Sequence, residues 1–264
     1  MHDIHERLRR IRAFALDMDG TIYMGERLFP FTRTFLERAQ ASGRKCFFLT
    51  NNSSKSSSAY LQKLNRLGIE ATTEQIITSG HATVTLLKRH HPGKRVFLLG
   101  TDALREEFGQ SGIIVDNEAP EVAVVAFDTG LTYERLCGFC DCVRTGLPYI
   151  ATHPDLNCPT EHGFIPDTGA FMALIHASTG RNPDAIAGKP HRPIVDEVLV
   201  RTGFVEGEIA MIGDRLYTDI KTGLLHGLLS ILVLSGETNA DMLAHSDVKP
   251  DLVFESLAGL MEYL

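Results

Sequence analysis

Short apolar runs alternate with longer amphipathic stretches along most of this chain. The runs have the length and composition of strands and lie at residues 14–16, 45–49, 95–99, 122–126, 208–212 and 228–234, whereas the stretches with helical periodicity lie at residues 32–41, 56–67, 102–108 and 132–145. This alternation is typical of βαβ units, in which helices connect parallel strands. We therefore predict an α/β fold with a mostly parallel sheet and helices on both of its faces.

The length of the chain bears on its domain organisation. Its 264 residues are more than a single domain usually contains, so one large α/β domain or a core with an inserted second domain would both fit. The block of residues 80–182 has strands and helices of its own, and the chemical motifs described below lie on both sides of it. We predict a core made of residues 1–79 and 183–264, with residues 80–182 forming an inserted domain.

Composition and charge exclude several classes of protein. Hydrophobic residues make up 44% of the chain and charged residues 22%, which is typical of a soluble globular protein. The formal net charge of -7 is spread without long runs of one sign, so the sequence predicts no basic face for nucleic acid. No apolar stretch approaches the roughly 20 residues that cross a bilayer. We expect no nucleic-acid or membrane partner and a cytoplasmic location.

The five cysteines are an odd number with no evident disulfide framework, which favours a reducing compartment. Cys137, Cys140 and Cys142 are close enough in sequence to suggest a zinc site. They lie, however, in a predicted helix, where Cys140 shares the apolar face with Leu136. Because an unpaired cysteine behaves as a small buried hydrophobe, we expect core packing rather than metal binding.

The segment Asp17-Met18-Asp19-Gly20-Thr21 directly follows the first predicted strand. Open α/β sheets bind their ligands beyond the carboxyl ends of the strands. Two carboxylates in this spacing can divide the labour, one as a nucleophile and the other as a general acid, and Gly20 permits a sharp turn between them and the following chain. Acidic turns after strands are common, so this segment alone is also compatible with a solvated turn.

Two further segments offer groups that suit phosphate. Thr50, Asn51 and Asn52 follow the second predicted strand and supply a hydroxyl, amides and backbone N–H groups. Lys189 follows a short apolar run within Gly188-Lys189-Pro190 and supplies a positive charge. Taken alone, the first segment is also compatible with an ordinary helix N-cap, and the lysine with a solvated surface residue.

A fourth segment, Gly213-Asp214-Arg215, follows the strand at residues 208–212, and Asp219 comes five residues after Asp214. Each of the four segments has its own predicted strand, so we expect all four to meet at one edge of one sheet. Converging carboxylates from Asp17, Asp19 and Asp214 would repel one another unless a cation lies between them, and an all-oxygen ligand set indicates Mg²⁺.

In this order the four segments resemble the signature motifs of the haloacid dehalogenase (HAD) superfamily, and the resemblance covers essentially the whole chain. The stretch of residues 21–30 is too short for a cap domain after the first motif. The long insertion between Thr50 and Lys189 is similar to that of the C2-capped, NagD-like or 4-nitrophenylphosphatase-like branch. The resemblance implies a Rossmann-like HAD core with an inserted α/β cap of the C2 type, which would cover the active site and contact the substrate.

The resemblance also implies the chemistry, that of a Mg²⁺-dependent phosphatase acting on small phosphomonoesters. Asp17 would attack phosphorus and form an aspartyl-phosphate, and Asp19 would protonate the leaving group and then deprotonate the water that opens the intermediate. The carboxylates of Asp17 and Asp214 and the backbone carbonyl of Asp19 would hold Mg²⁺. A haloacid dehalogenase lacks the acid at the position of Asp19, so this residue favours phosphate ester hydrolysis over dehalogenation.

The remaining site residues are assigned in the same way. Thr50, Asn51 and Lys189 would bind phosphoryl oxygens, with Asn52 a further candidate, and Asp219 would orient a metal-bound water or Lys189. In the cap, the loop of residues 151–155, together with Asp167-Thr168-Gly169, is the best candidate for substrate contact. Its His153 stands where relatives often have asparagine, and a histidine that merely packs in a cap turn is the open alternative.

The sequence leaves other functions open. A phosphotransferase would use the same covalent intermediate, and a regulatory protein that binds a phosphorylated metabolite would keep the same pocket. A receiver domain of signalling proteins also uses a phosphorylated aspartate, but it needs only about half this length. The sequence does not name the substrate, which could be a sugar phosphate, a nucleotide or a related metabolite. Monomer and homodimer are both compatible with it.

Overall fold

The computed structural model describes residues 2–160 and 163–264. The chain divides into two compact units, each formed by segments distant in sequence. The core unit consists of Met1–Leu49, Leu61–Ile77 and Val198–Leu264, and the cap unit consists of Thr50–Tyr60 and Thr78–Glu197. The loop that starts at Thr50 and the segment around Lys189 therefore belong to the cap unit.

The core unit is built on a six-stranded sheet with the strand order β15-β14-β13-β1-β4-β5. The pairs β1–β4, β1–β13, β13–β14 and β14–β15 are parallel. Strands along this part of the chain are β1 (Ala13–Asp17), β2 (Tyr23–Met24), β3 (Arg27–Leu28), β4 (Lys45–Thr50), β5 (Ile76–Thr78), β13 (Ile209–Gly213), β14 (Leu229–Val233) and β15 (Leu252–Phe254). The helices that lie wholly or partly in this unit are α1 (His2–Arg9), α2 (Thr32–Ala41), α3 (Ser57–Arg66), α8 (Arg192–Thr202), α9 (Lys221–His226), α10 (Ala240–His245) and α11 (Leu257–Leu260), with 3₁₀ turns at Thr73–Gln75, Glu206–Glu208 and Met261–Tyr263.

The central strands of this sheet are buried on both faces. All five residues of β13 and the first four of β1 are buried, as expected for parallel strands covered by helices on both sides. The run of residues 14–16 therefore reads as continuously apolar rather than alternating. Its first polar residue, Asp17, comes where the strand ends, and this places the carboxylate at the edge of the hydrophobic core.

The cap unit has a five-stranded sheet with the order β12-β9-β8-β6-β7 and a separate antiparallel hairpin of β10 and β11. Its strands are β6 (Arg95–Leu99), β7 (Ile114–Val115), β8 (Val122–Val125), β9 (Tyr149–Ala151), β10 (Asn157–Thr160), β11 (Gly163–Pro166) and β12 (Ala185–Ile186). Its helices are α4 (Ser79–His90), α5 (Asp102–Gln110), α6 (Tyr133–Arg144) and α7 (Thr168–Thr179).

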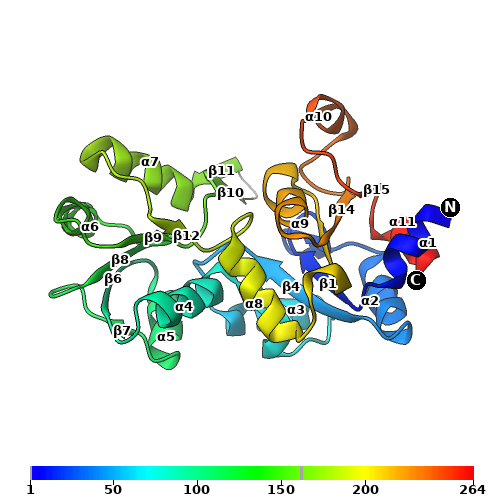
Figure 1. Ribbon diagram of the computed structural model, residues 1–264, viewed down its shortest axis with the longest axis horizontal. Helices are drawn as coiled ribbons and strands as arrows, with labels where there is room; N and C mark the ends of the chain where they lie inside the picture. The colour runs from blue at the N-terminus through cyan, green and yellow to red at the C-terminus, as the bar shows by residue number, and fades with distance from the viewer. Residues whose placement is uncertain (1, 161–162) are drawn as a thin grey trace. The chain divides into compact units, whose positions relative to one another are not determined.

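Successive residues of the cap strands point into two different cores. Leu98 and Val124 pack with residues of α4 and α5, whereas Leu99 and Val125 pack with residues of α6 and α7. The two helix pairs therefore cover opposite faces of the cap sheet, as Figure 1 shows. Cys140 is buried in the second of these cores and Cys142 packs against it, which confirms the predicted core packing, whereas Cys137 is exposed.

The predicted α/β fold is confirmed, and most of the predicted elements lie within one or two residues of the observed ones.

The expectation that all four motif segments follow strands of one sheet was wrong. Lys189 follows β12, which pairs with β9 in the cap sheet, so its strand does not belong to the sheet that carries Asp17 and Asp214. The backbone of Gly188 donates to Thr152 O at 2.6 Å and continues the pairing with the β9 side of the cap. Nothing in the sequence of this short strand reveals which sheet it joins.

Candidate active site

Carboxylates gather at the carboxyl ends of two adjacent strands of the core sheet. Asp17 is the last residue of β1, and Asp214 directly follows β13, which pairs with β1 in parallel. Asp17, Asp214 and Asp219 each place one carboxylate oxygen within 4.8 Å of the others, and Asp214 and Asp219 are buried. Three acidic groups so close together suit a hard divalent cation such as Mg²⁺, which prefers oxygen ligands.

The Asp214 carboxylate is fixed by the chain around it. Its Oδ2 accepts a hydrogen bond from Glu237 N–H at 2.6 Å, and its Oδ1 accepts one from the Thr21 hydroxyl at 3.5 Å. Gly20 and Gly236 both pass so close to this carboxylate that a Cβ on either would collide with it. Glu237 was not identified from the sequence, although Ser235-Gly236-Glu237 directly follows the strand at residues 228–234, and this position was a usable signal.

Asp219 is fully buried and lies in the π-helical turn Leu216–Ile220. Its Oδ2 accepts a hydrogen bond from Arg215 N–H at 3.1 Å, and a Cβ at Gly213 would collide with its side chain. Leu216 and Ile220 of the same turn pack on Leu232 of β14 and anchor it to the sheet. The sequence predicts Asp219 just inside a helix, and the structure places its carboxylate with those of Asp17 and Asp214.

Asp19 lies in the turn that leads into the β2–β3 hairpin. Gly20 N–H donates to Tyr23 O at 2.8 Å and closes this turn. Burial raises the pKa of Asp19, and this effect exceeds the lowering by the charge of Lys63 and by the hydrogen bond from the Gly25 backbone. A carboxyl group with a raised pKa keeps its proton to a higher pH, which suits a general acid.

Lys63 was not identified from the sequence, where it is one polar residue of an amphipathic helix. Its ammonium lies 3.9 Å from the centre of the Tyr23 ring and 3.6 Å from Oε1 of Glu26, and its side chain is only 12% exposed. The lysine therefore connects α3 to the β2–β3 hairpin beside Asp19.

In the cap unit, Asn51 and Lys189 lie together. Asn51 Oδ1 accepts a hydrogen bond from Lys189 N–H at 2.7 Å, and Asn51 Nδ2 donates to Lys189 O at 3.0 Å. Both residues are buried, with 5% and 2% of their surfaces exposed. The Thr50 hydroxyl accepts a hydrogen bond from Asn52 N–H at 3.2 Å, and Asn52 Oδ1 in turn accepts from Ser54 N–H at 2.9 Å.

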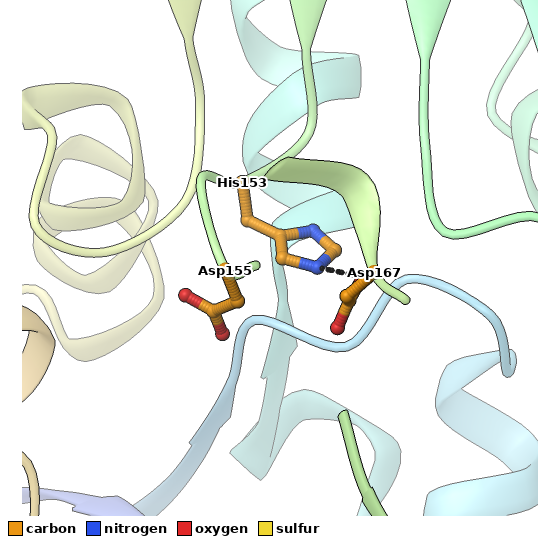
Figure 2. A group of neighbouring side chains, drawn as sticks. All are labelled: His153, Asp155 and Asp167. Atoms are coloured by element: carbon orange, nitrogen blue, oxygen red, sulfur yellow. Dashed lines mark hydrogen bonds and ion pairs between the residues drawn. The ribbon is translucent and has the colours of Figure 1, made fainter. Parts of the chain in front are cut away.

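His153 is completely buried in the cap unit. Its Nε2 lies 2.8 Å from Asp167 Oδ1. A dashed line marks this contact in Figure 2. Its Nδ1 lies 2.9 Å from the Thr152 hydroxyl and 3.5 Å from the Ser79 hydroxyl. Burial by itself lowers the pKa of His153, but the hydrogen-bonded charge of Asp167, assisted by that of Asp155, raises the pKa above its ordinary value. Both ring nitrogens are thus engaged with protein groups, which agrees with the packing alternative for this residue.

A second group of side chains resembles a metal site in composition. His153, Asp155 and Asp167 each place one potential ligand atom within 4.8 Å of the others. The histidine and Asp167 form the ion pair described above, and Asp155 Oδ1 accepts a hydrogen bond from Asn51 Nδ2 at 3.1 Å. These contacts account for the proximity of the three groups. Among the described residues, no group of side chains that could hold a metal ion includes Cys137, Cys140 or Cys142.

Within residues 2–160 and 163–264, no helix is long and apolar enough to cross a membrane.

The chain is similar to known phosphatases over almost its whole length. A family model for haloacid dehalogenase-like hydrolases matches residues 14–114, and a second, HAD-hydrolase-like model matches residues 186–260. An acid sugar phosphatase of Staphylococcus aureus (strain MRSA252) is 32% identical over 251 residues, which cover 95% of this chain and 96% of the relative.

Solved structures agree with these matches. The crystal structure of a 4-nitrophenylphosphatase from Thermotoga maritima has a TM-score of 0.94 and 44% identity, covering 97% of this chain and 98% of that one. A glycerol phosphate phosphatase from Mycobacterium tuberculosis, crystallised in complex with calcium, has a TM-score of 0.89 and 28% identity. The match covers 96% of this chain and 76% of that one. The chain therefore belongs to the haloacid dehalogenase-like hydrolases and is a phosphatase of the NagD and 4-nitrophenylphosphatase type.

Proposed function

We propose that this phosphatase hydrolyses small phosphomonoesters in two steps, through an aspartyl-phosphate formed on Asp17 and with the help of Mg²⁺. The observation that carries the proposal is the group of Asp17, Asp214 and Asp219, whose carboxylate oxygens lie within 4.8 Å of one another at the carboxyl ends of β1 and β13. A nucleophilic carboxylate beside a cation site is the arrangement that this reaction requires.

The donor set fits Mg²⁺ because all of its members are oxygens and because Asp214 is held in one orientation by Thr21 and Glu237. In this proposal the carboxylates of Asp17 and Asp214, with the backbone carbonyl of Asp19, hold the cation, and Asp219 orients the groups around it. When bound, Mg²⁺ supplies positive charge that reduces the repulsion between the nucleophilic carboxylate and the phosphoryl group.

In the first step a carboxylate oxygen of Asp17 forms a bond to phosphorus while the bond to the leaving oxygen breaks. Asp19 donates its proton to that oxygen, so the alcohol leaves neutral. In the second step Asp19 takes a proton from water, the water oxygen attacks phosphorus, and the bond to Asp17 breaks to release phosphate. The pKa of Asp19, raised by burial, supports its role as the acid of the first step.

Thr50 and Lys189 are proposed to bind the transferred phosphoryl group, with Asn51, through its backbone, and Asn52 as further candidates. Thr50 ends β4, whose preceding residue, Leu49, pairs with Asp17 in the sheet. The backbone of Lys189 is hydrogen-bonded to the side-chain amide of Asn51, the residue after Thr50. The charge of Lys189 would stabilise the negative charge that moves between the oxygens during transfer.

For the substrate we propose a small phosphate ester, with sugar phosphates as the first class to test. The support is the name of the relative from Staphylococcus aureus, an acid sugar phosphatase, together with that of the glycerol phosphate phosphatase. Both names indicate phosphatases that act on phosphate esters of small polyhydroxy compounds. A cytoplasmic location is proposed on separate grounds, since all five cysteines are free thiols.

The proposal is tested by measuring phosphate release from a panel of sugar phosphates, polyol phosphates and nucleotides with Mg²⁺, and again with EDTA. We expect release that requires Mg²⁺ and that falls at least about 10³-fold in Asp17→Asn, because this variant lacks the nucleophile. Release that persists at the wild-type rate in EDTA would contradict the metal dependence. Release that persists in Asp17→Asn would contradict the assignment of the nucleophile.

A further inference from the structure

The side-chain amide of Asn51 is hydrogen-bonded through both its oxygen and its nitrogen within the cap unit. Its Oδ1 accepts from Lys189 N–H, and its Nδ2 donates to Lys189 O and to Asp155 Oδ1 at 3.1 Å. An asparagine Nδ2 carries two hydrogens, and both have an acceptor here. The amide therefore forms two hydrogen bonds with the Lys189 backbone, one to its N–H and one to its carbonyl, as a residue of a neighbouring strand would.

Asp155 reinforces the orientation of this amide, which the N–H and carbonyl groups of Lys189 also favour. An ionised carboxylate only accepts hydrogen bonds, so Nδ2 of Asn51 must face it. With Nδ2 in that position, Oδ1 faces Lys189 N–H and both backbone groups of Lys189 are satisfied. The opposite orientation would set Oδ1 against the oxygens of Asp155 and Lys189 and would set the NH₂ group against Lys189 N–H. Three favourable contacts would then become three unfavourable ones.

Asp155 is itself held by a loop with little freedom. Gly169 N–H donates to Asp155 O at 2.7 Å, and a Cβ on Gly169 would collide with the backbone of residues 154 and 155. Two residues before Asp155, His153 is fixed to Asp167 at the start of α7 (Figure 2). On the other side, a Cβ on Gly188 would lie 2.6 Å from Asn51 Oδ1 and 2.7 Å from His153 Cβ, so only glycine lets the Lys189 segment approach this closely.

From these contacts we propose that Asp155 is a positioning residue that acts on Lys189 through the Asn51 amide. A lysine side chain has four rotatable bonds, so the place of its ammonium depends first on where its backbone is held. Asp155 adds a charged hydrogen bond that holds the amide of Asn51 in this orientation, and the amide holds both backbone groups of Lys189. The inference rests on the proposed role of Lys189 at the phosphoryl group, and it assigns Asp155 to the preparation of that site rather than to substrate contact.

A double-mutant cycle tests the inference in the full-length enzyme with Mg²⁺ and 4-nitrophenyl phosphate. The four proteins are wild type, Asp155→Ala, Lys189→Ala and the double variant. We expect Asp155→Ala to lower kcat/KM at least about tenfold and to weaken inhibition by inorganic phosphate by a similar factor, because a charged hydrogen bond that orients the amide is lost. In the Lys189→Ala background the same substitution should change kcat/KM less than about twofold, since the residue through which it acts is gone.

Two controls separate positioning from general stability. Asp155→Asn keeps an oxygen that can accept from Asn51 Nδ2 and should retain kcat/KM within about threefold. Asp184→Ala removes another cap carboxylate, which accepts from Tyr149 N–H at 2.8 Å and pairs with Arg181, and should lower stability without lowering kcat/KM. If Asp155→Ala does not fold, Asp155→Ser, which lacks the charge but keeps a small polar group, takes its place in the cycle.

Each outcome has one meaning. A tenfold loss in the wild-type background that disappears in the Lys189→Ala background supports the relay. An equal loss in both backgrounds, or wild-type kcat/KM and phosphate inhibition in Asp155→Ala, overturns it. Failure of the proposed function would look different, because Asp17→Asn would then retain turnover. An inactive Asp17→Asn beside a fully active Asp155→Ala removes the relay alone.

Discussion

The Nε2 atom of His153 lies 2.8 Å from Oδ1 of Asp167, and the two side chains are 0% and 4% exposed. The pair connects the loop after β9 to the first turn of α7, where Asp167 also accepts a hydrogen bond from Thr168 N–H. Burial lowers the pKa of His153, but the charge and hydrogen bond of Asp167, together with the charge of Asp155, raise it above its ordinary value, so the fold stabilises the protonated ring. The loop that carries Asp155 therefore depends on a buried ion pair.

This pair predicts how the stability of the protein varies with pH. A histidine whose pKa is higher in the folded state than its ordinary 6.5 contributes stability that is fully present below 6.5 and is lost as pH rises through the folded-state pKa. We expect His153→Asn to lower the free energy of unfolding by about 3 kcal/mol near pH 6, since Asp167 loses its buried partner. The difference from wild type should shrink as pH rises toward about 9.

Urea denaturation at several pH values measures this difference. His176→Asn is the matched control, because His176 is an exposed histidine of α7 and its loss should leave the pH dependence as in wild type. A difference between wild type and His153→Asn that stays constant from about pH 6 to about pH 9 would show that the folded state does not favour the charged ring.

The second prediction concerns Gly20, in the turn after Asp19. Gly20 has a φ of 90°, and a Cβ there would collide with the carboxylate of Asp214. Gly20→Ala should therefore displace a proposed metal ligand and lower Mg²⁺ affinity and kcat at least about tenfold. Gly43 has a similar φ of 80° with nothing within 4 Å of its Cβ position, so Gly43→Ala should cost about 1 kcal/mol of stability and leave activity unchanged. Equal activity in the two variants would contradict the crowded position of Asp214.

Cysteine reactivity gives a third prediction, which is independent of catalysis. Burial raises the pKa of Cys46 to about 12, whereas Cys137 is exposed on α6. Because the thiolate is the reactive form, Cys137 should be alkylated first and Cys46 only after unfolding. Peptide mass spectrometry after brief treatment with iodoacetamide measures the order. Modification of Cys46 at the same rate as Cys137 in the folded protein would contradict the packing around β4.

Local sequence patterns predicted much of this molecule because the relevant signals are local. One apolar run ends at Asp17 and another is followed by Gly213 and Asp214, so both carboxylates are placed at strand ends by local sequence alone. The sequence did not reveal that Lys189 follows a strand of the cap sheet, since two residues of β12 carry no information about their partner strand. Nor could it reveal the bond between Asn51 and Lys189, which lie 138 positions apart.

The surroundings of His153 could not be predicted from local sequence either. Its place in a polar loop was compatible with a substrate contact or with packing in a cap turn, and the structure surrounds its ring with Asp167, Thr152 and Ser79. Ser79 is 74 positions away in sequence, so the burial of the ring follows from tertiary packing alone. The catalytic assignments depend on short motifs, whereas the residues that support those motifs come from distant segments.

Phosphorylation of Asp17 can be tested by trapping the aspartyl-phosphate intermediate. In Asp19→Asn the first step should still proceed with 4-nitrophenyl phosphate and Mg²⁺, because nitrophenolate leaves without a proton, but no base remains to activate water for the second step. We predict a burst of about one nitrophenolate per active site and a phosphoryl group on the peptide that contains Asp17, found by mass spectrometry after acid quench. An Asp19→Asn enzyme that shows neither the burst nor the label, while the wild type turns over, would contradict the account.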